Sequence, residues 1–342
     1  MVSAFIASPP VGFAVSLDAA GTPAFDADFD LLTTADESLR QRIERLPGYR
    51  FWARWLRWRT TFVGTTVSEY ALFPDERDAA QLLTQLKSAH GRRHRLTIIK
   101  DIPQSSPLLH AAENAHADAL CSAAVAAGFV IVEGQALAYV PIDFRDIDAY
   151  LARVSASRRK DIRRKLRSRS SLCIEAIPAG SACFSDAAVV AEFQDLFDEV
   201  YAQSEVHFDC PQRAYFSRLF GDAQSGGMIF TYRCEGRLIG WNLCYESGGR
   251  LIDKYVGFRY PDARTHNLYA VSWMHNLDYA IRRGLTHYVA GWTDPKVKAQ
   301  LGATFTFTRH AVYARSRLLR FVLRRLSTSF ESDRQWHDES VR

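Results

Sequence analysis

The stretch that decides the fold runs from Met228 to Phe258 and reads MIFTYRCEGRLIGWNLCYESGGRLIDKYVGF. Three runs of aliphatic, aromatic and β-branched residues are separated by two short glycine turns, Glu235-Gly236 and Ser247-Gly248-Gly249. Glycine adopts the positive φ that a tight turn needs, so this pattern is typical of β-hairpins. It predicts a three-stranded antiparallel meander. The expected strands are Met228–Cys234, Arg237–Tyr245 and Leu251–Phe258.

Helices and strands alternate on both sides of this meander. A strong helical pattern follows it up to Gly284, and a glycine after two arginines is typical of a helix end. The other elements expected in this half are a strand at 172–177, helices at 187–203, 213–220 and 268–283, a strand at 286–290, a short helix at 294–301, a strand at 305–314 and a basic helix at 317–326.

The first half of the chain shows a simpler alternation. Strands are expected at 62–73, 95–102 and 129–142, with helices at 74–90 and 108–127 between them. This β-α-β-α-β order predicts an α/β fold with a mixed sheet. The chain has 342 residues, and a typical domain has about 100 to 200, so two domains are expected.

Composition excludes several classes of protein. With 47% hydrophobic residues and 43 Lys and Arg against 38 Asp and Glu, the chain is too apolar and too balanced in charge for a disordered protein. Neither an apolar run of ~18 residues nor a basic segment at the start is present, so no membrane span and no secretory signal is expected. Six cysteines without a Cys-x-x-Cys pair argue against disulfides and a metal site, and the expected location is the cytoplasm.

Several short motifs occur together in the second half. They are Leu-Ile-Asp-Lys-Tyr-Val-Gly at 251–257, His-Asn-Leu-Tyr at 266–269, Leu-Asp-Tyr-Ala-Ile-Arg-Arg-Gly at 277–284, and Gly291 followed by Lys298 and Gly302. In this order they resemble the FemAB-like branch of the GNAT acyltransferase superfamily. The basic segment 155–165 resembles the helix that joins two GNAT-like lobes in that branch. The implied organisation is a first lobe at 1–150, a connecting helix at 151–170, a second lobe at 171–328 and a polar tail at 329–342.

The resemblance implies a transferase that forms an amide bond by direct attack of an acceptor amine on an activated acyl or aminoacyl donor. Members of the family use aminoacyl-tRNA to extend peptidoglycan precursors, and other branches of the superfamily use acyl-CoA or an acyl-carrier protein. The donor is then a co-substrate, and no tightly bound cofactor or metal is expected. A lobe that keeps the fold as a non-catalytic binding module is the competing interpretation.

The segment 258–266 bears on the choice of donor. In acetyl-CoA enzymes of the superfamily, a glycine-rich loop at this place holds the pyrophosphate on backbone amides. Here no glycine follows Gly257, so aminoacyl-tRNA or a carrier protein is favoured over CoA, although an acyl-CoA enzyme acting on a lipid or small-molecule amine stays possible. Arg259 and Arg264 could hold a phosphate by their side chains, or they are solvated loop charges.

Two candidate catalytic residues come from the end of this lobe and from the third meander strand. Lys298 stands where the resemblance implies a lysine, four residues before Gly302, and could stabilise a phosphate or the developing oxyanion; otherwise it is an exposed helix lysine. Lys296 is the alternative lysine. Asp253 could act as a general base, or it is a cross-strand partner.

Two further candidates are Tyr255 and His266. Tyr255 could donate a proton to the leaving group, or it belongs to the core. His266 could deprotonate the acceptor amine, because a histidine titrates near neutral pH, or it caps a helix. Relatives often carry a nearby glutamate, and Ala270 takes its place here, which puts the base in doubt.

Further residues fall where the resemblance implies contacts with substrate. His207 and Asp209 follow a long helix, and with Cys210 they lack the spacing of a zinc site. Lys254 alternates with Tyr255 along its strand and is expected on the opposite face. The complete set of candidate substrate contacts is His207, Asp209, Lys254, Asn267, Tyr269 and Trp292.

The connecting segment is strongly basic. Residues 153–169 contain nine Lys or Arg and one acid, Asp161, for a local charge of +8. A helix over this segment would present cations to a polyanion such as a tRNA acceptor stem or the acidic face of a carrier protein, or it is a solvated connector. The residues expected to contact the polyanion are Arg159, Lys160, Arg163 and Arg164.

A second unusual segment, 49–59, interleaves aromatic residues with arginines. At helical spacing Trp52, Trp55 and Arg59 share one side. Such a pattern suits stacking on bases or a peripheral membrane contact through Trp52, Trp55 and Trp58. A buried aromatic stripe with arginine stems reaching outward is the preferred interpretation.

Overall fold

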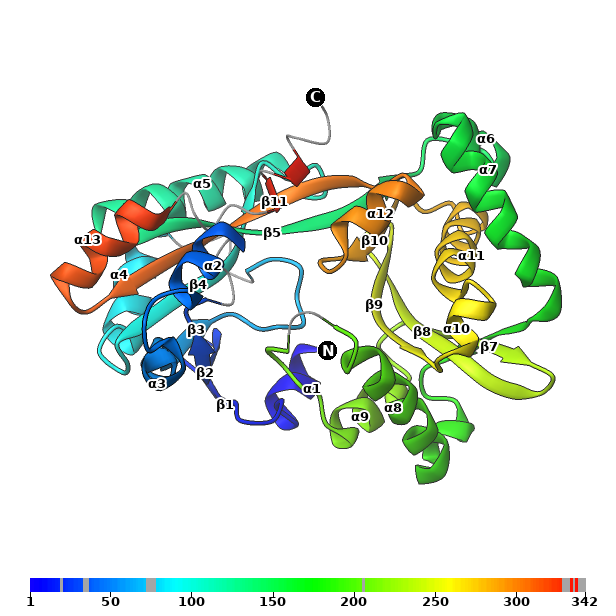
Figure 1. The fold of residues 1–342 in the computed structure, drawn as a ribbon, viewed down its shortest axis with the longest axis horizontal. Helices are drawn as coiled ribbons and strands as arrows, with labels where there is room; N and C mark the ends of the chain where they lie inside the picture. Colours follow the sequence, from blue (N-terminus) through cyan, green and yellow to red (C-terminus); the bar gives the residue numbers. More distant parts are fainter. Residues whose placement is uncertain are drawn as a thin grey trace. The chain divides into compact units, whose positions relative to one another are not determined.

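A computed structural model of the chain describes residues 1–18, 21–32, 37–71, 78–204, 207–327, 333–334 and 336–337. The chain forms two compact units, which we call the N-terminal unit and the central unit (Figure 1). The N-terminal unit comprises Val2–Ala136 and Thr306–Arg342, and the central unit comprises Leu137–Phe305 with Met1. The division into two α/β lobes is confirmed.

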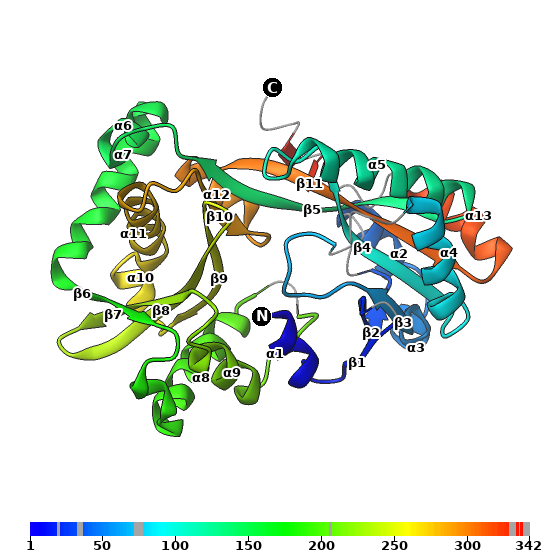
Figure 2. The same cartoon turned by 180° about the vertical axis from the view of Figure 1, so that it is seen from behind.

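The N-terminal unit is built on a mixed sheet with strand order β1-β2-β3-β4-β11-β5. Its strands are β1 (Ala14–Leu17), β2 (Pro23–Asp30), β3 (Arg57–Val63), β4 (Leu96–Gln104), β5 (Val130–Pro141) and β11 (Thr304–Ala314). Its helices are α1 (Val2–Ala7), α2 (Glu37–Glu44), α3 (Tyr49–Trp52), η1 (Ala53–Leu56), α4 (Ala79–His90), α5 (Ala111–Ala126) and α13 (Arg317–Leu326). Helices α4 and α5 pack on one face, where Leu82 and Leu120 join the core around Ile99 (Figure 2).

The central unit contains the predicted meander. Its strands are the end of β5, β6 (Cys173–Pro178), β7 (Gly227–Cys234), β8 (Arg237–Ser247), β9 (Arg250–Phe258) and β10 (His287–Gly291). Strands β7, β8 and β9 pair antiparallel in sequence order, so the meander prediction is confirmed. The remaining elements are α6 (Ile147–Arg153), α7 (Ala156–Lys165), η2 (Leu166–Ser171), η3 (Ala182–Ser185), α8 (Ala187–Tyr201), α9 (Arg213–Gly221), α10 (Asp262–Thr265), α11 (Leu268–Arg282) and α12 (Pro295–Leu301).

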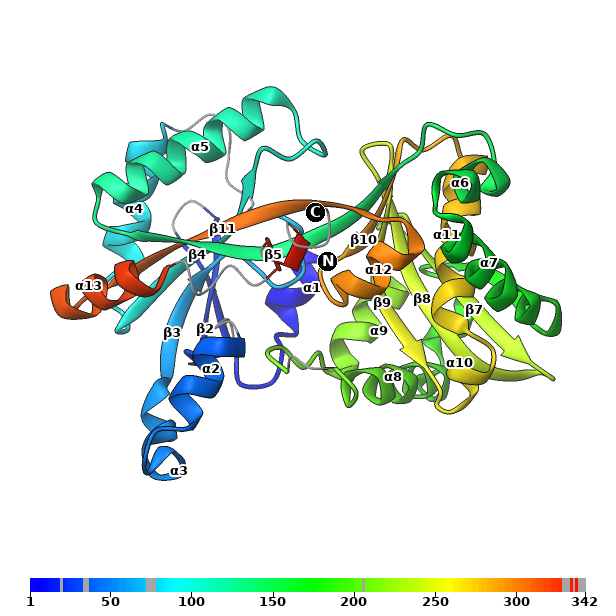
Figure 3. The same cartoon turned by 45° about the horizontal axis from the view of Figure 1, so that its top comes forward.

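Neighbouring residues of β8 show how helices cover both faces of this sheet (Figure 3). The Trp241 indole donates a hydrogen bond to the Phe193 carbonyl of α8 (2.9 Å), whereas Asn242 points to α11. Gly257 faces Trp241 from β9, and a Cβ there would come within 2.2 Å of the indole nitrogen. Only glycine therefore lets the tryptophan lie flat under α8.

The boundaries of the units differ from the predicted lobes at 1–150 and 171–328. Residues Phe307–Ala314 of β11 pair with β4, so the last strand and α13 belong to the N-terminal unit. The end of β5 pairs with β10 and belongs to the central unit. These boundaries are decided by strand pairing between residues roughly 150 to 220 positions apart, which local sequence patterns do not reveal.

Two predictions for the N-terminal unit need correction. The strand expected at 62–73 is β3, Arg57–Val63, because Thr65 Oγ1 accepts hydrogen bonds from the Val67 and Ser68 amides and turns the chain. Residues 72–77 lie outside the described residues. The buried aromatic stripe is also wrong: the helix stops at Trp52, and the side chains of Phe51 (82%) and Trp55 (67%) are exposed. Among the described helices, none has the length and apolarity needed to cross a bilayer.

Candidate functional site

The site lies where β9 stops pairing with β10. The parallel pairing joins Arg250–Ile252 to His287–Val289, and Asp253 is the next residue of β9. At the same place β9 has a bulge against β8: Tyr255 lies opposite Leu243 and Asp253 opposite Cys244, so Lys254 is the extra residue. A bulge breaks the alternation of side chains, and Asp253 and Tyr255 therefore point to opposite faces.

Asp253 lies on the face of α11, in a buried polar network. Its carboxylate accepts hydrogen bonds from Asn276 Nδ2 (2.9 Å), Tyr288 Oη (3.0 Å) and Asn242 Nδ2 (3.4 Å). Burial raises the pKa of Asp253 to about 6, although the hydrogen bonds from Tyr288 and Asn242 and the charge of Lys298 act in the opposite direction.

The asparagines hold one another as well as the carboxylate. Asn242 Nδ2 donates to Asn276 Oδ1 (3.1 Å), and Tyr232 Oη donates to Asn242 Oδ1 (2.8 Å). Asn242, Asn276 and Tyr232 are fully buried, so each polar atom depends on its neighbours for a partner. Sequence reasoning missed Asn242, Asn276 and Tyr288; the available signal was a lone asparagine in an otherwise apolar strand and another in an apolar helix.

Lys298 supplies the second charge of the site. It lies on α12, whose end at Gly302 is pressed against Tyr150: a Cβ on Gly302 would come within 2.5 Å of the Tyr150 oxygen. The side chain of Lys298 is only 3% exposed, which corrects the alternative of an exposed helix lysine. Burial lowers its pKa to about 8, and the carboxylates of Asp253 and Asp294 oppose that shift.

The ammonium of Lys298 donates no hydrogen bond to any residue in the described part of the chain. A Cβ on Gly291 would lie 3.9 Å from Lys298 Nζ and 3.7 Å from the Asp253 carbonyl, so the ammonium faces bare backbone at the end of β10. Its charge acts on Asp253 without a direct ion pair between the two. A buried donor without an acceptor is costly, and this position suits a ligand oxygen.

Three other predicted residues lie at the start of α11 or just after β10. Tyr269 is the second residue of α11, and burial raises its pKa, with a smaller effect from the charges of Asp294 and Asp253. Trp292 follows Gly291 and is half-buried. Asn267 precedes α11 with a positive φ of 52° and is half-buried.

His266 is not part of the pair. Its Nδ1 lies 3.2 Å from Ser171 Oγ, and its carbonyl accepts a hydrogen bond from Ser168 Oγ (2.7 Å), both in η2. About 12 Å of helix separates the start of α11 from Asn276, which binds Asp253. The structure therefore does not bring His266 together with Asp253 and Lys298.

Tyr255 lies on the opposite face, under α8 and α9. Its hydroxyl is 3.0 Å from that of Tyr215, and its ring packs against Phe197 and Phe216. Asp209 is near enough for its charge to raise the pKa of Tyr255, after the larger effect of burial. This is the core environment that the sequence left as the alternative for Tyr255.

His207 and Lys254 have separate surroundings. His207 Nε2 lies 2.9 Å from the Tyr201 carbonyl, and its ring packs edge-on against the Tyr201 ring at the end of α8. Lys254 is the half-buried bulge residue itself.

The segment after β9 forms a helical turn instead of a phosphate loop. The amide of Arg259 donates to Ile239, the amide of Tyr260 donates to the Glu199 carboxylate (2.7 Å), and the amides of residues 263–267 donate to carbonyls within the turn. The side chain of Arg259 lies 3.7 Å from Glu199, and that of Arg264 donates to Gln203 (2.6 Å). The backbone amides and the two arginine side chains of this segment are therefore already paired within the protein.

The basic helix α7 is partly neutralised. Arg163 pairs with Asp148 (3.0 Å), and Arg164 pairs with Asp161 (2.6 Å). Within the residues that the structure describes, Arg159 and Lys160 have no acidic partner. Arg158 donates to the Ala299 carbonyl (3.3 Å), which ties α7 to the helix that carries Lys298.

A comparison with protein families finds one match, and it covers the site. Residues 156–299 match the family profile described as "Acetyltransferase (GNAT) domain". This part of the chain is therefore similar to GNAT acetyltransferase domains. The matched range contains Asp253, Asn276 and Lys298, so the polar network lies inside this domain. A search of curated proteins finds no match to the chain, and no group of three metal-binding side chains occurs among the described residues.

Solved structures extend the likeness in fold to nearly the whole chain. L-PGS from Bacillus licheniformis has a TM-score of 0.56 at 9% identity, covering 96% of this chain and 94% of that one. The C-terminal domain (DUF2156) of a putative lysylphosphatidylglycerol synthetase from Agrobacterium fabrum has a TM-score of 0.54 at 13% identity, covering 91% and 88%. FemX has a TM-score of 0.52 at 11% identity, covering 94% and 97%. The chain therefore shares its fold with these three structures.

Proposed function

We propose that the chain forms an amide bond by transferring an aminoacyl or acyl group from an activated ester or thioester to an acceptor amine. The observation that carries this proposal is the buried Lys298 ammonium without a protein acceptor, set beside the Asp253 carboxylate in a GNAT domain. In a low-dielectric site, such a donor stabilises negative charge far better than it would in water.

The chemistry follows from the charges. Near neutral pH the Lys298 amine holds its proton and Asp253 is ionised. As the acceptor nitrogen bonds to the acyl carbon, the carbonyl oxygen becomes an oxyanion, which Lys298 stabilises by a hydrogen bond. The tetrahedral intermediate then collapses, and the bond between the acyl carbon and the leaving oxygen or sulfur breaks. The leaving group takes up a proton, and the attacking amine loses one. Asp253, fixed by Asn276 and Tyr288, keeps the lysine charged.

The favoured donor is aminoacyl-tRNA or a carrier-protein thioester rather than CoA. The amides that would bind a pyrophosphate are used within the turn or by Glu199, whose carboxylate would repel a phosphate. Arg159 and Lys160 are available on α7, which adjoins α12, and could bind a larger polyanion. Both donors occur in the cytoplasm, so the proposal places the reaction there.

The deciding experiment compares three donors side by side: radiolabelled aminoacyl-tRNA, acyl-carrier protein and acyl-CoA, each with a panel of primary amines. Transfer from either macromolecular donor, seen as a mass increase of the amine, supports the proposal and excludes a binding-only module. Efficient transfer from CoA alone would overturn the donor assignment. No transfer from any donor, with intact folding, would favour the binding module.

The role of Lys298 is tested in the same assay. Lys298→Met removes the ammonium and keeps the apolar stem, and Lys296→Met makes the same change at an exposed position of α12. Loss of one oxyanion donor costs about 10²- to 10³-fold in turnover, so only the first variant should be impaired. Equal activity of the two variants would remove Lys298 from the site.

A further inference from the structure

A large basic cavity lies in the N-terminal unit. It has a volume of about 830 Å³, and six arginines, one histidine and two tryptophans line it. The six arginines are Arg54, Arg57, Arg59, Arg93, Arg95 and Arg315. They come from η1, β3, the turn before β4 and the end of β11, so the fold gathers them from distant parts of the sequence.

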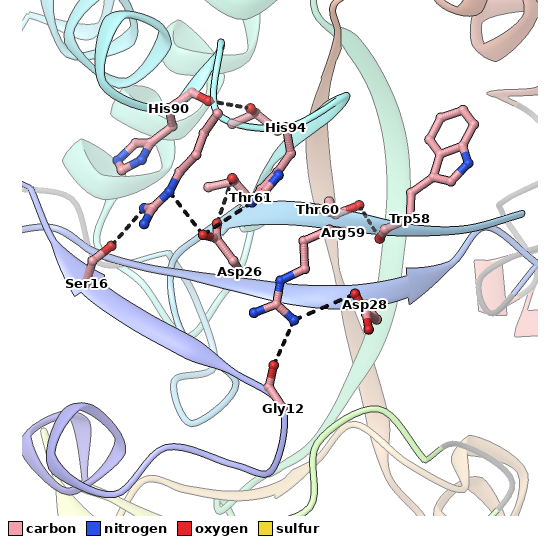
Figure 4. A network of polar contacts seen from close by, with 12 residues as sticks. Gly12, Ser16, Asp26, Asp28, Trp58, Arg59, Thr60, Thr61, His90 and His94 are labelled. Carbon is pink, nitrogen blue, oxygen red and sulfur yellow. Dashed lines mark hydrogen bonds and ion pairs between the residues drawn. The ribbon is translucent and has the colours of Figure 1, made fainter. Parts of the chain in front are cut away.

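Acidic side chains compensate only part of this charge. Asp26 lies 3.0 Å from Arg93 and 3.3 Å from His94, and Asp28 lies 3.6 Å from Arg59 (Figure 4). The Trp58 indole points away from this network in the same view. In the described part of the chain, the other four arginines, Arg54, Arg57, Arg95 and Arg315, have no acidic partner. The cavity therefore keeps a surplus of positive charge.

An apolar cavity adjoins the basic one. It has a volume of about 550 Å³ and shares Trp58, Arg95 and Arg315 with its neighbour. Its other wall is the start of α13, with Leu318, Leu319 and Val322. A charged recess thus continues into an apolar one, the arrangement that an anionic amphiphile requires.

Helix α13 also turns apolar side chains to the outside. Leu318 is 73% exposed, Phe321 56% and Val322 41%, whereas Leu319 is half-buried. Basic residues flank the exposed side, and Arg325 lies over the Phe321 ring (5.2 Å). Burying the exposed apolar side chains of α13 against a partner or a membrane removes them from water, which is energetically favourable. An amphipathic helix of this kind is therefore typical of an interface.

We propose that the basic cavity and the outer side of α13 form a docking surface for a membrane that contains anionic phospholipids. Arginines without acidic partners bind headgroup phosphates, and the exposed aromatic and aliphatic side chains enter the interface. Nucleic acid explains less, because Leu318 and Val322 contribute nothing to the recognition of bases or phosphates. The surface goes beyond the transfer chemistry of the central unit, and its test needs no transfer reaction.

The test is flotation of the full chain with vesicles of phosphatidylcholine, with or without phosphatidylglycerol. Binding is expected only with phosphatidylglycerol, and it should weaken with salt. One arginine near an anionic surface is worth about fivefold in partitioning, so the double variant Arg54→Gln, Arg57→Gln should bind roughly 25-fold more weakly. Arg145→Gln, an exposed position of the central unit that is 89% accessible, is the charge-matched control and should bind normally.

A second pair of variants tests the apolar part. Phe321→Asp should abolish binding and Phe321→Trp should retain it, because an aromatic ring is preserved at the interface. Equal binding of all variants, or no binding of the wild-type chain to anionic vesicles, would overturn the proposal. RNA bound at the same salt and lost in the double arginine variant, without vesicle binding, would identify a nucleic-acid surface instead.

Discussion

Replacing Lys298 by methionine should stabilise the protein while it impairs transfer. Burial lowers the pKa of Lys298 from 10.5 to about 8. At about 1.4 kcal/mol for each pKa unit, this difference corresponds to about 3 kcal/mol, which the folded protein loses by holding the lysine charged. Methionine fills nearly the same volume and carries no charge, so the variant avoids that loss.

The stability difference between Lys298→Met and the wild-type protein should depend on pH. Between about pH 8 and about pH 10.5 the unfolded chain still holds a proton on Lys298 that the folded chain has released, so the wild-type protein gains stability as pH rises. The methionine variant has no such gain. Its advantage in unfolding free energy should therefore be about 3 kcal/mol near pH 7 and should shrink towards zero above about pH 10.

The measurement is urea denaturation, followed by tryptophan fluorescence across this pH range. Wild type, Lys298→Met and Lys296→Met are compared, because titrating groups that Lys298 does not influence cancel in the differences. Asp253, on which the Lys298 charge acts, has a pKa of about 6 and titrates mainly below this pH range. Lys296 is exposed, so its variant should show a constant small difference. A constant difference for Lys298→Met as well, or a clear loss of stability at pH 7, would refute the argument that the ammonium is buried at a cost.

Four other variants test the rest of the site. The transfer rate should fall below about pH 6 as Asp253 takes up a proton, and Asp253→Asn should lose at least about tenfold at pH 7, measured as kcat. Tyr255→Phe should lower the unfolding free energy by about 1 kcal/mol, because it loses the hydrogen bond to Tyr215. Tyr255→Phe and His266→Ala should both keep kcat/KM within the wild-type order of magnitude. A large loss of kcat/KM in His266→Ala would show that His266 takes part in the reaction. Gly302→Ala should cost roughly 1 to 3 kcal/mol in thermal unfolding, because φ is +100° and the added Cβ would collide with Tyr150; unchanged stability would show that α12 is free to move.

Local signals were sufficient for much of the central unit. Glycine turns marked the meander, and Gly284 and Gly302 marked the ends of two helices that the structure confirms. The family motifs led to Lys298 and Asp253, which the structure brings into one site. These features depend on residues close in sequence, where propensity and turn chemistry act directly.

The remaining parts depend on contacts that no spacing rule describes. Asn242 and Asn276 meet across a strand and a helix, 34 positions apart, and each looks like an isolated polar residue until the two elements pack. The alternation rule predicted opposite faces for Lys254 and Tyr255, but the bulge instead separates Tyr255 from Asp253. The aromatic segment was expected to be helical throughout, yet the chain leaves the helix after Trp52 and enters β3 at Arg57.

The position of β11, which follows the central unit in sequence but pairs with β4 of the N-terminal unit, affects the order of folding during synthesis. The N-terminal unit draws on residues from both ends of the chain, so the strand that pairs with β4 leaves the ribosome only after the whole central unit has been synthesised. Until then β4 exposes an unpaired strand edge, whereas the central unit is already complete in sequence. During synthesis the central unit should therefore fold first, and the N-terminal unit should complete its sheet only when β11 has been made.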